Sequence, residues 1–224
     1  MRDNPYVTEK QAKADLFPID KFFKSELLLT TNSVVCNSSG QVLLRLFKGI
    51  IPESLLRTLE ESTNRMEPDL RYRHQTKDKR GDYISVKFGS YIERGGSGRI
   101  IISEDNTTFD FFITDNHKLW QFMSSVFATF APKESSKVKK LPPEYRIFGN
   151  FSVGYLHFTP IYKQHRDKKD YRWCCSILFG NFVRADLDFP YLNTKLRGCR
   201  GDLAFFWSRI VFHTLSDIYT GSSV

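Results

Sequence analysis

The sequence predicts an α+β protein in which N-terminal helices support a C-terminal double-stranded β-helix, or jelly-roll. Three observations lead to this fold class. An amphipathic helical pattern over residues 55–66 follows an apolar run of strand length, and a second helical pattern covers residues 115–130. From residue 145 onward, short apolar or alternating runs follow one another without helices between them, separated by Gly, Asn, Asp and Pro. Strands at this spacing are typical of a double-stranded β-helix.

The chain is long enough for one large domain. Its 224 residues can bury a full core, and 41% of them are hydrophobic, including 20 Phe and 10 Tyr. A disordered chain would contain far fewer such residues. We expect residues 1–40 to form an N-terminal arm and residues 41–224 to form one domain, with helical support at 41–143 and the β-helix core at 144–224.

The first elements lie on either side of residue 41. Residues 8–16 have a short helical pattern within the arm, and residues 41–51 form an apolar run of strand length. Pro52-Glu-Ser54 then introduces a helix, because Pro is favoured at a helix start. Apolar residues at 55, 56, 59 and 66, with charged residues between them, predict an amphipathic helix over 55–66.

A hairpin and a second helix follow. Residues 83–92 and 99–103 are strand-like, and the glycine-rich segment 94–99 predicts a flexible turn between them. This segment is not a phosphate-binding loop, because it lacks the Gly-Lys-Ser/Thr end of a P-loop and the helix after it. Residues 115–130 form the clearest helical pattern, and its apolar stripe predicts core packing. The stripe contains Leu119, Phe122, Met123, Val126, Phe127 and Phe130.

The C-terminal part of the chain is almost entirely strand-like. A Lys/Ser-rich segment at 132–143, ending in Pro142-Pro143, closes the helical half. We expect strands within residues 148–158, 171–179, 185–189, 195–196, 203–207 and 211–213. Because no helical pattern interrupts them, they predict one continuous β core.

A His-x-Asp pair and a distant histidine form the strongest functional signal. Alternate residues of a strand share a face, so His165 and Asp167 can point together while Arg166 points away. His213 follows 46 residues after Asp167, beyond the apolar run that begins at Gly201. Two imidazoles and one carboxylate form the facial triad that binds Fe(II) and leaves positions open for a cosubstrate and O2. Without a third histidine or a cysteine nearby, a structural zinc site is less favoured.

The specificity of this signal comes from the combination of its parts. A bare His-x-Asp pair occurs often by chance, and a histidine at a strand end is more often held by hydrogen bonds in a core. Together with several β runs and the run Gly201-Asp-Leu-Ala-Phe-Phe206, however, the pattern favours a metal site. We interpret His74, His117 and His157 as structural or surface residues.

Positive charge points to an acidic partner. The net charge is +8, and nucleic acid is the commonest acidic partner of such a protein. One basic cluster is interleaved with Tyr72, His74 and Tyr83, which places stacking groups beside phosphate-binding ones. This cluster consists of Arg71, Arg73, Lys77, Lys79 and Arg80. A second group consists of Lys133, Lys137, Lys139 and Lys140.

The cysteines and the apolar runs bear on the cellular compartment. Cys36, Cys174, Cys175 and Cys199 have no Cys-x-x-Cys spacing, so zinc-ribbon and thioredoxin motifs are not supported, and we expect reduced thiols.

No apolar run reaches the roughly 18 residues that a membrane span requires, and the N-terminus lacks the apolar region of a signal peptide. We therefore expect a soluble, intracellular protein without a membrane partner, with the nucleus as a candidate compartment.

The segment from about residue 148 to His213 resembles the catalytic core of the 2-oxoglutarate/Fe(II)-dependent dioxygenase superfamily. The resemblance is to the TET/JBP-like, fungal-type branch, whose members carry a Phe-Gly-x-Phe, a Leu-x-Leu-Pro-x-Leu and a Gly-Asp-Leu strand ahead of the distal histidine. The corresponding stretches here are Gly180-Asn-Phe182, Ala185-Asp-Leu-Asp-Phe-Pro-Tyr-Leu192 and Arg200-Gly-Asp-Leu-Ala-Phe-Phe-Trp-Ser-Arg-Ile-Val-Phe-His213. The resemblance covers roughly the C-terminal third of the chain, and residues 1–140 carry no assignable motif.

This resemblance implies a cofactor, a cosubstrate and a reaction. His165, Asp167 and His213 would hold Fe(II), with no catalytic residue beyond these metal ligands, and Tyr155 would lie beside the cosubstrate 2-oxoglutarate. The reaction would use O2, split 2-oxoglutarate to succinate and CO2, and hydroxylate a C–H bond. In the nucleic-acid branch, this bond belongs to the methyl group of thymine or 5-methylcytosine, presented as a flipped-out base.

One departure from the family pattern concerns the cosubstrate. The family pattern has an Arg or Lys roughly ten to fifteen residues after the distal histidine, paired with the 5-carboxylate of 2-oxoglutarate. Here no basic residue follows Arg209. Three explanations stay open: the last strand is missing, Arg172 supplies the charge from an earlier strand, or the cosubstrate site has decayed and the protein is inactive.

Two other functions also stay open. A protein hydroxylase of the prolyl-hydroxylase type shares the His-x-Asp pair and the distal histidine but does not need basic clusters. A catalytically degenerate module would bind nucleic acid without turnover. Fe(II)-dependent succinate release separates both enzymes from the module, and salt-sensitive DNA binding separates base modification from peptide hydroxylation.

Overall fold

A computed structural model describes residues 27–73, 75–78, 81–92, 100–102, 109–140, 142–158, 164–167, 170 and 172–219. The chain divides into two compact units, each of which is built from separate stretches of sequence. The first unit contains Met1–Pro52, Lys77–Asp82 and Ile161–Val224, and the second contains Glu53–Thr76 and Tyr83–Pro160. The first unit therefore combines segments from both ends of the chain.

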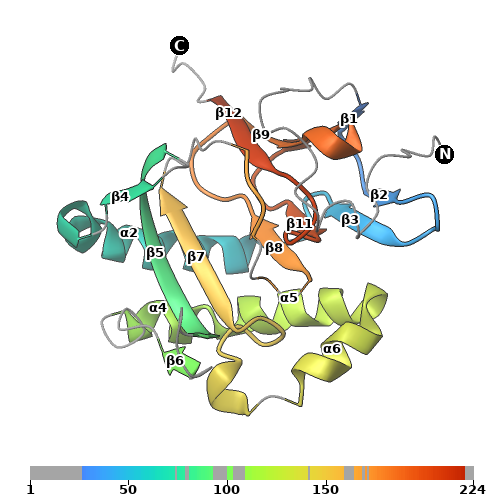
Figure 1. Cartoon of the computed structure of the whole chain (residues 1–224). Helices are drawn as coiled ribbons and strands as arrows, with labels where there is room; N and C mark the ends of the chain where they lie inside the picture. The colour runs from blue at the N-terminus through green and yellow to red at the C-terminus, as the bar shows by residue number, and fades with distance from the viewer. Residues whose placement is uncertain are drawn as a thin grey trace. The chain divides into compact units, whose positions relative to one another are not determined.

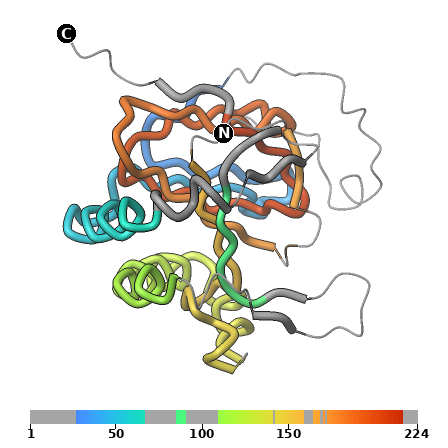
Figure 2. The backbone as a smooth tube through the Cα atoms, turned by 90° about the vertical axis from the view of Figure 1, so that its left-hand side faces the viewer, coloured from blue at the N-terminus to red at the C-terminus, as the bar shows by residue number. Residues whose placement is uncertain are grey.

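Two four-stranded sheets make up the first unit. One sheet has the order β1-β10-β9-β12 and the other the order β2-β3-β11-β8 (Figure 1). The strands are β1 Leu27–Leu29, β2 Ser33–Cys36, β3 Val42–Phe47, β8 Cys174–Ile177, β9 Arg184–Phe189, β10 Thr194–Gly198, β11 Leu203–Phe206 and β12 Thr214–Tyr219. Only the β1–β10 pair among these is parallel. Figure 2 shows the blue N-terminal strands running among the orange and red C-terminal ones.

Both sheets contribute to one hydrophobic core. On β9, Ala185, Leu187 and Phe189 belong to this core, whereas Asp186 and Asp188 do not, as expected for alternating residues of a strand. The other core residues are Leu43, Leu44, Leu46, Leu192, Leu196, Ala204, Phe206, Trp207, Ile210, Val211 and Leu215. Two sheets with a shared apolar interior give a rigid frame for side chains at the strand ends.

Helices dominate the second unit. The elements between Pro52 and Ile161 are α2 Glu53–Arg73, β4 Gln75–Asp78, β5 Gly81–Ile92, β6 Ile100–Ile102, α4 Asp110–Asp115, α5 His117–Phe130, α6 Pro132–Val138, the 3-10 turn η1 Pro143–Tyr145 and β7 Val153–Phe158. The end of β4 and the start of β5 belong to the Lys77–Asp82 stretch of the first unit, and the other elements belong to the second. The third sheet has the order β4-β5-β6, and β7 also pairs with β5, antiparallel (Figure 1). The molecule is thus a mixed α+β protein.

The second unit has its own core around α5. Leu119, Trp120, Met123 and Phe127 are buried on this helix, which follows the helical period. The buried Asn150 side chain donates hydrogen bonds to Ser124 O (3.1 Å) and Ser135 Oγ (3.0 Å). Because Ser124 lies on α5 and Ser135 on α6, this one amide ties both helices to the loop before β7.

Most predicted elements are present, with two corrections. The helices predicted over 55–66 and 115–130 appear as α2 and α5. The strand predicted at 211–213 is wrong: His213 forms only an isolated bridge, and β12 begins at Thr214. The segment 27–36, expected in the N-terminal arm, contains β1 and β2, which belong to the two sheets. The predicted helix at 8–16 and turn at 94–99 lie outside the described residues.

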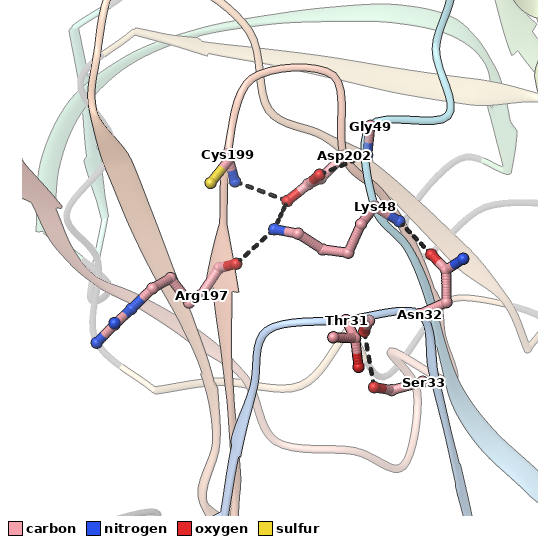
Figure 3. A network of polar contacts seen from close by, with 8 residues as sticks. All are labelled: Thr31, Asn32, Ser33, Lys48, Gly49, Arg197, Cys199 and Asp202. Carbon is pink, nitrogen blue, oxygen red and sulfur yellow. Dashed lines mark hydrogen bonds and ion pairs between the residues drawn. The ribbon is translucent and has the colours of Figure 1, made fainter.

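A buried ion pair fixes the start of the strand that leads to the distal histidine. Asp202, which is 3% exposed, pairs with the Lys48 ammonium (Figure 3). Its carboxylate also accepts hydrogen bonds from Gly49 N (2.8 Å) and Cys199 N (2.6 Å). Lys48 Nζ in turn donates to Arg197 O at 2.8 Å. Asp202 is the acidic residue of the Gly-Asp-Leu motif, and these contacts give it a structural role at the junction of β3, β10 and β11.

Candidate metal centre

His165 and His213 are joined directly through their main chains. His165 N donates to His213 O at 3.1 Å, and His213 N donates to His165 O at 3.0 Å. This is the hydrogen-bonded pair of an antiparallel bridge, in which both side chains point to the same face. The ring centroids are accordingly 4.4 Å apart. Two segments distant in sequence are therefore held in register at the histidines.

Asp167 completes a cluster with these two imidazoles. Its Oδ2 lies 3.4 Å from His213 Nε2, and its Oδ1 lies 3.8 Å from His165 Nε2. One ligand atom from each of the three residues lies within 4.8 Å of the others. The side chain of His213 is 6% exposed, whereas that of Asp167 is 30% exposed. The cluster is anchored in the core on one side and accessible on the other.

A main-chain carbonyl sets the orientation of the His213 ring. His213 Nδ1 lies 3.1 Å from Val211 O, and a hydrogen bond to a carbonyl requires the proton on Nδ1. In the neutral imidazole Nε2 would then carry the lone pair, and Nε2 is the ring nitrogen that faces Asp167 Oδ2. Metal-binding histidines commonly have their second nitrogen fixed in this way. Phe206 packs against the same ring, with centroids 4.7 Å apart.

The three residues fit a divalent metal by their chemistry. Two neutral imidazole nitrogens and one carboxylate oxygen, presented on one side, are the donor set of the non-haem Fe(II) facial triad. Their spacing allows one ion to contact all three ligand atoms, since none lies beyond 4.8 Å of another. Asp167 is the most exposed of the three, with a side chain 30% exposed.

The residues between the ligands pack on the opposite face of the bridge. The Arg166 guanidinium carbon lies 4.8 Å from the centroid of the Phe212 ring, and Phe212 contacts the Tyr191 ring at 4.6 Å. Such cation–π and aromatic contacts stabilise the pairing of the two segments. Arg166 therefore points away from the ligands, as the strand alternation predicted.

Two residues beside the ligands had no signal in the sequence. The Asp170 carboxylate accepts a hydrogen bond from Ser208 Oγ at 2.5 Å. Burial raises the pKa of Asp170 to about 6, an effect that the Ser208 hydrogen bond opposes and the nearby Asp167 reinforces. Asp170 stands after a lysine pair and Ser208 stands in a Trp-Ser-Arg run, so no spacing or motif marks either residue.

The two residues predicted to bind the cosubstrate belong to different units. Arg172 lies in the first unit with its guanidinium carbon 5.0 Å from the centroid of the Trp207 ring. Tyr155 lies on β7 in the second unit, is 55% exposed, and stacks on His157 with ring centroids 5.9 Å apart. Their roles toward 2-oxoglutarate stay predictions.

The basic clusters are described only in part. Arg71 and Arg73 lie on the last turns of α2 and Lys77 lies on β4, but only their backbone is described, and Lys79 and Arg80 lie outside the described residues. The second group lies on and after α6, and its four lysines are exposed. Nucleic-acid contact by either cluster stays a prediction.

Comparison with solved structures identifies the fold. The chain is similar to NgTET1 in a complex with 5mC DNA, with a TM-score of 0.69 and 19% sequence identity, over 96% of this chain and 88% of that chain. At this identity the likeness concerns the fold alone, and it confirms a TET-like fold, as the sequence resemblance implied. No family model matches the sequence, and no curated protein matches it. Within the described part of the chain, none of the helices combines the length and apolarity that a membrane crossing requires.

Proposed function

We propose that this protein is an Fe(II)- and 2-oxoglutarate-dependent dioxygenase that hydroxylates the methyl group of a pyrimidine base in nucleic acid. The observation that carries the proposal is the His165, Asp167 and His213 cluster, with its ligand atoms within 4.8 Å of one another, on a TET-like fold. The two packed sheets of the first unit would be the double-stranded β-helix of such an enzyme. Both the resemblance in sequence and the donor chemistry lead to the same ion.

The chain's own residues would hold and orient the ion. His165 and His213 would each bind through Nε2, and Asp167 through a carboxylate oxygen. When bound, Fe(II) would supply the activation of O2 that is coupled to the splitting of 2-oxoglutarate into succinate and CO2. The Val211 carbonyl would keep His213 Nδ1 protonated and Nε2 available, and Phe206 would exclude water from one side of the ring.

The cosubstrate would require a cation for its distal carboxylate. Arg172 is the candidate, because it belongs to the same unit as the triad and its guanidinium can bind a carboxylate through two hydrogen bonds. Stacking on Trp207 would limit the freedom of the Arg172 side chain and so reduce the entropy that binding costs. Tyr155 is the second residue that we propose for cosubstrate binding, on the sequence resemblance alone.

Nucleic acid is the proposed substrate for two reasons. The net charge of +8 favours a polyanion, and the similar NgTET1 structure contains 5mC DNA. The basic cluster around residues 71–80 would contact phosphates, while the reacting base would be flipped into the site. Such a substrate makes the nucleus the proposed compartment.

The decisive experiment measures metal content and succinate release on the purified chain. The protein would be incubated with Fe(II), ascorbate and 2-oxoglutarate, with duplexes that carry either 5-methylcytosine or unmodified cytosine, and the nucleosides would be analysed by mass spectrometry. The variant His165→Ala would lose Fe(II) binding and turnover while remaining folded by circular dichroism. His117→Ala removes an exposed histidine of the second unit and provides the matched control.

The outcomes separate the alternatives. Hydroxymethylated nucleosides that depend on Fe(II) and 2-oxoglutarate would support the proposal. Succinate release that responds to a proline-containing peptide but not to DNA would support a prolyl-hydroxylase-type enzyme. Salt-sensitive DNA binding without succinate would support a degenerate binding module, and unchanged metal affinity in His165→Ala would overturn the assignment of the ligands.

A further inference from the structure

Ser208 contacts the loop that carries Asp167 at two points. Its main-chain oxygen accepts a hydrogen bond from Asp167 N at 3.0 Å, and its hydroxyl donates to Asp170 Oδ2 at 2.5 Å. Ser208 is fully buried, with 0% exposure. Asp170 N also donates to Asp167 O at 2.9 Å, so the loop is closed by its own hydrogen bond between the two attachment points.

The same turn that contains Ser208 also orients His213. Ile210 N and Val211 N both donate to Trp207 O, at 3.0 and 2.8 Å, which closes a tight turn around Ser208. Val211 O, at the end of this turn, is the acceptor for His213 Nδ1. One buried turn therefore determines the position of Asp167 on one side and of His213 on the other.

We propose that Ser208 is a positioning residue of the metal centre, which acts by holding the Asp167 loop through Asp170; this inference rests on the proposed function. The main-chain contact fixes the backbone nitrogen of Asp167. The side-chain contact to Asp170 fixes the far end of the loop. With both ends attached to Ser208, the Asp167 carboxylate is held toward the two imidazoles before the ion arrives.

A purely structural role for Ser208 gives a different expectation. A buried hydroxyl needs a hydrogen-bond partner, and removing it destabilises a fold whether or not a ligand site is near. Ser62 is the matched control, because it is also 0% exposed, its hydroxyl donates to Leu59 O at 3.0 Å, and it lies in the second unit. Stability and metal affinity must therefore be measured separately.

The test measures the affinity of the metal-free chain for Mn(II) or Co(II) by calorimetry, alongside thermal unfolding. Ser208→Ala should bind the metal about 10- to 100-fold more weakly, the range typical of residues that orient metal ligands. Ser62→Ala should keep the wild-type affinity even where its unfolding temperature falls. A Ser208→Ala variant that loses stability but keeps the wild-type metal affinity would overturn the proposal.

Asp170 variants test the same hydrogen bond from its other end, and they stay informative if Ser208→Ala does not fold. Asp170→Ala removes the acceptor, whereas Asp170→Asn removes the charge but keeps an oxygen to which Ser208 can donate. The proposal requires Asp170→Asn to bind the metal more tightly than Asp170→Ala, and the losses from Ser208→Ala and Asp170→Ala to be non-additive in the double variant. Equal affinities of the two Asp170 variants would mean that charge alone matters and would overturn it.

These results are separable from those on the overall function. A wild-type chain that binds metal but releases no succinate would refute the proposed activity, while the effect of Ser208 on affinity would still stand. A chain that turns over normally with Ser208→Ala at unchanged metal affinity would refute only the positioning role. A wild-type chain that binds no divalent metal would refute both.

Discussion

The Lys48–Asp202 pair is the most direct test of how the core of the first unit is held together. We expect Asp202→Asn to destabilise the protein strongly, because the carboxylate accepts hydrogen bonds from Gly49 N, Cys199 N and the Lys48 ammonium. An asparagine offers one oxygen and turns an amide NH2 group toward these donors. Lys48 would then lose its counter-ion at a site where it is only 20% exposed.

The magnitude follows from burial and from the number of donors. Breaking a buried ion pair by changing one partner costs about 3–5 kcal/mol, because the remaining charge is left without compensation. Replacing both partners with apolar residues, as in Lys48→Met with Asp202→Leu, removes this uncompensated charge. The double variant should therefore be more stable than Asp202→Asn, although Gly49 N and Cys199 N lose their acceptor.

Urea denaturation followed by tryptophan fluorescence measures these free energies of unfolding. Arg57→Met provides the control, since Arg57 and Glu53 form an ion pair on the surface of α2 with side chains 69% and 53% exposed. That pair should contribute less than about 1 kcal/mol. An Asp202→Asn protein as stable as wild type would refute the structural role assigned to the Gly-Asp-Leu aspartate.

Four further outcomes are expected. The folded-state pKa of Asp170 is raised from 3.8 to about 6, so its stabilising contribution is complete only well below 3.8 and is lost as the pH rises through 6. Between about pH 3 and pH 8 the metal-free wild type should lose about 3 kcal/mol relative to Asp170→Asn, measured by denaturation at each pH. Gly89→Ala should lower the free energy of unfolding by roughly 2–6 kcal/mol through backbone strain and overpacking. At Gly89 φ is +103°, and an added Cβ atom would lie 2.1 Å from Ser152 O. A loss below about 1 kcal/mol would contradict the close approach of β5 and β7. Arg172→Met should raise the KM for 2-oxoglutarate about tenfold or more, since a hydrogen bond to a charged group contributes about 1.5–3 kcal/mol. Arg209 is exposed, and the control variant Arg209→Met should leave this KM unchanged. The first basic cluster contains Arg71, Arg73, Lys77, Lys79 and Arg80. Reversing its charges should weaken DNA binding and reduce the dependence of that binding on salt concentration. An unaltered salt slope would exclude the cluster as a DNA contact.

Local patterns predicted elements well where burial follows a single period. The helix over 115–130 was visible because one apolar stripe faces a core, and β9 because its apolar residues alternate with aspartates. The strand predicted at 211–213 failed because Val211 closes a turn on Trp207, so only His213 reaches the bridge. Apolar content alone does not distinguish a buried turn from a buried strand.

The candidate metal site was only partly visible in the sequence. His165, Asp167 and His213 could be selected because ligand chemistry restricts residue types and strand geometry restricts spacing. The structure brings these three together, but it also adds Asp170 and Ser208, which have no characteristic spacing. Contacts of that kind depend on which loops meet after folding, and a single sequence does not contain this information.

The paired main-chain hydrogen bonds between His165 and His213 also bear on how the site acquires its ion. In small zinc domains the unfolded chain gathers around the metal, so a chelator unfolds them. Here Phe206 packs on His213, and the paired backbone hydrogen bonds hold His165 beside it, independently of any ligand. Chelation should therefore empty the site reversibly, and a spectroscopically useful ion such as Co(II) could be exchanged into a chain that never leaves its native state.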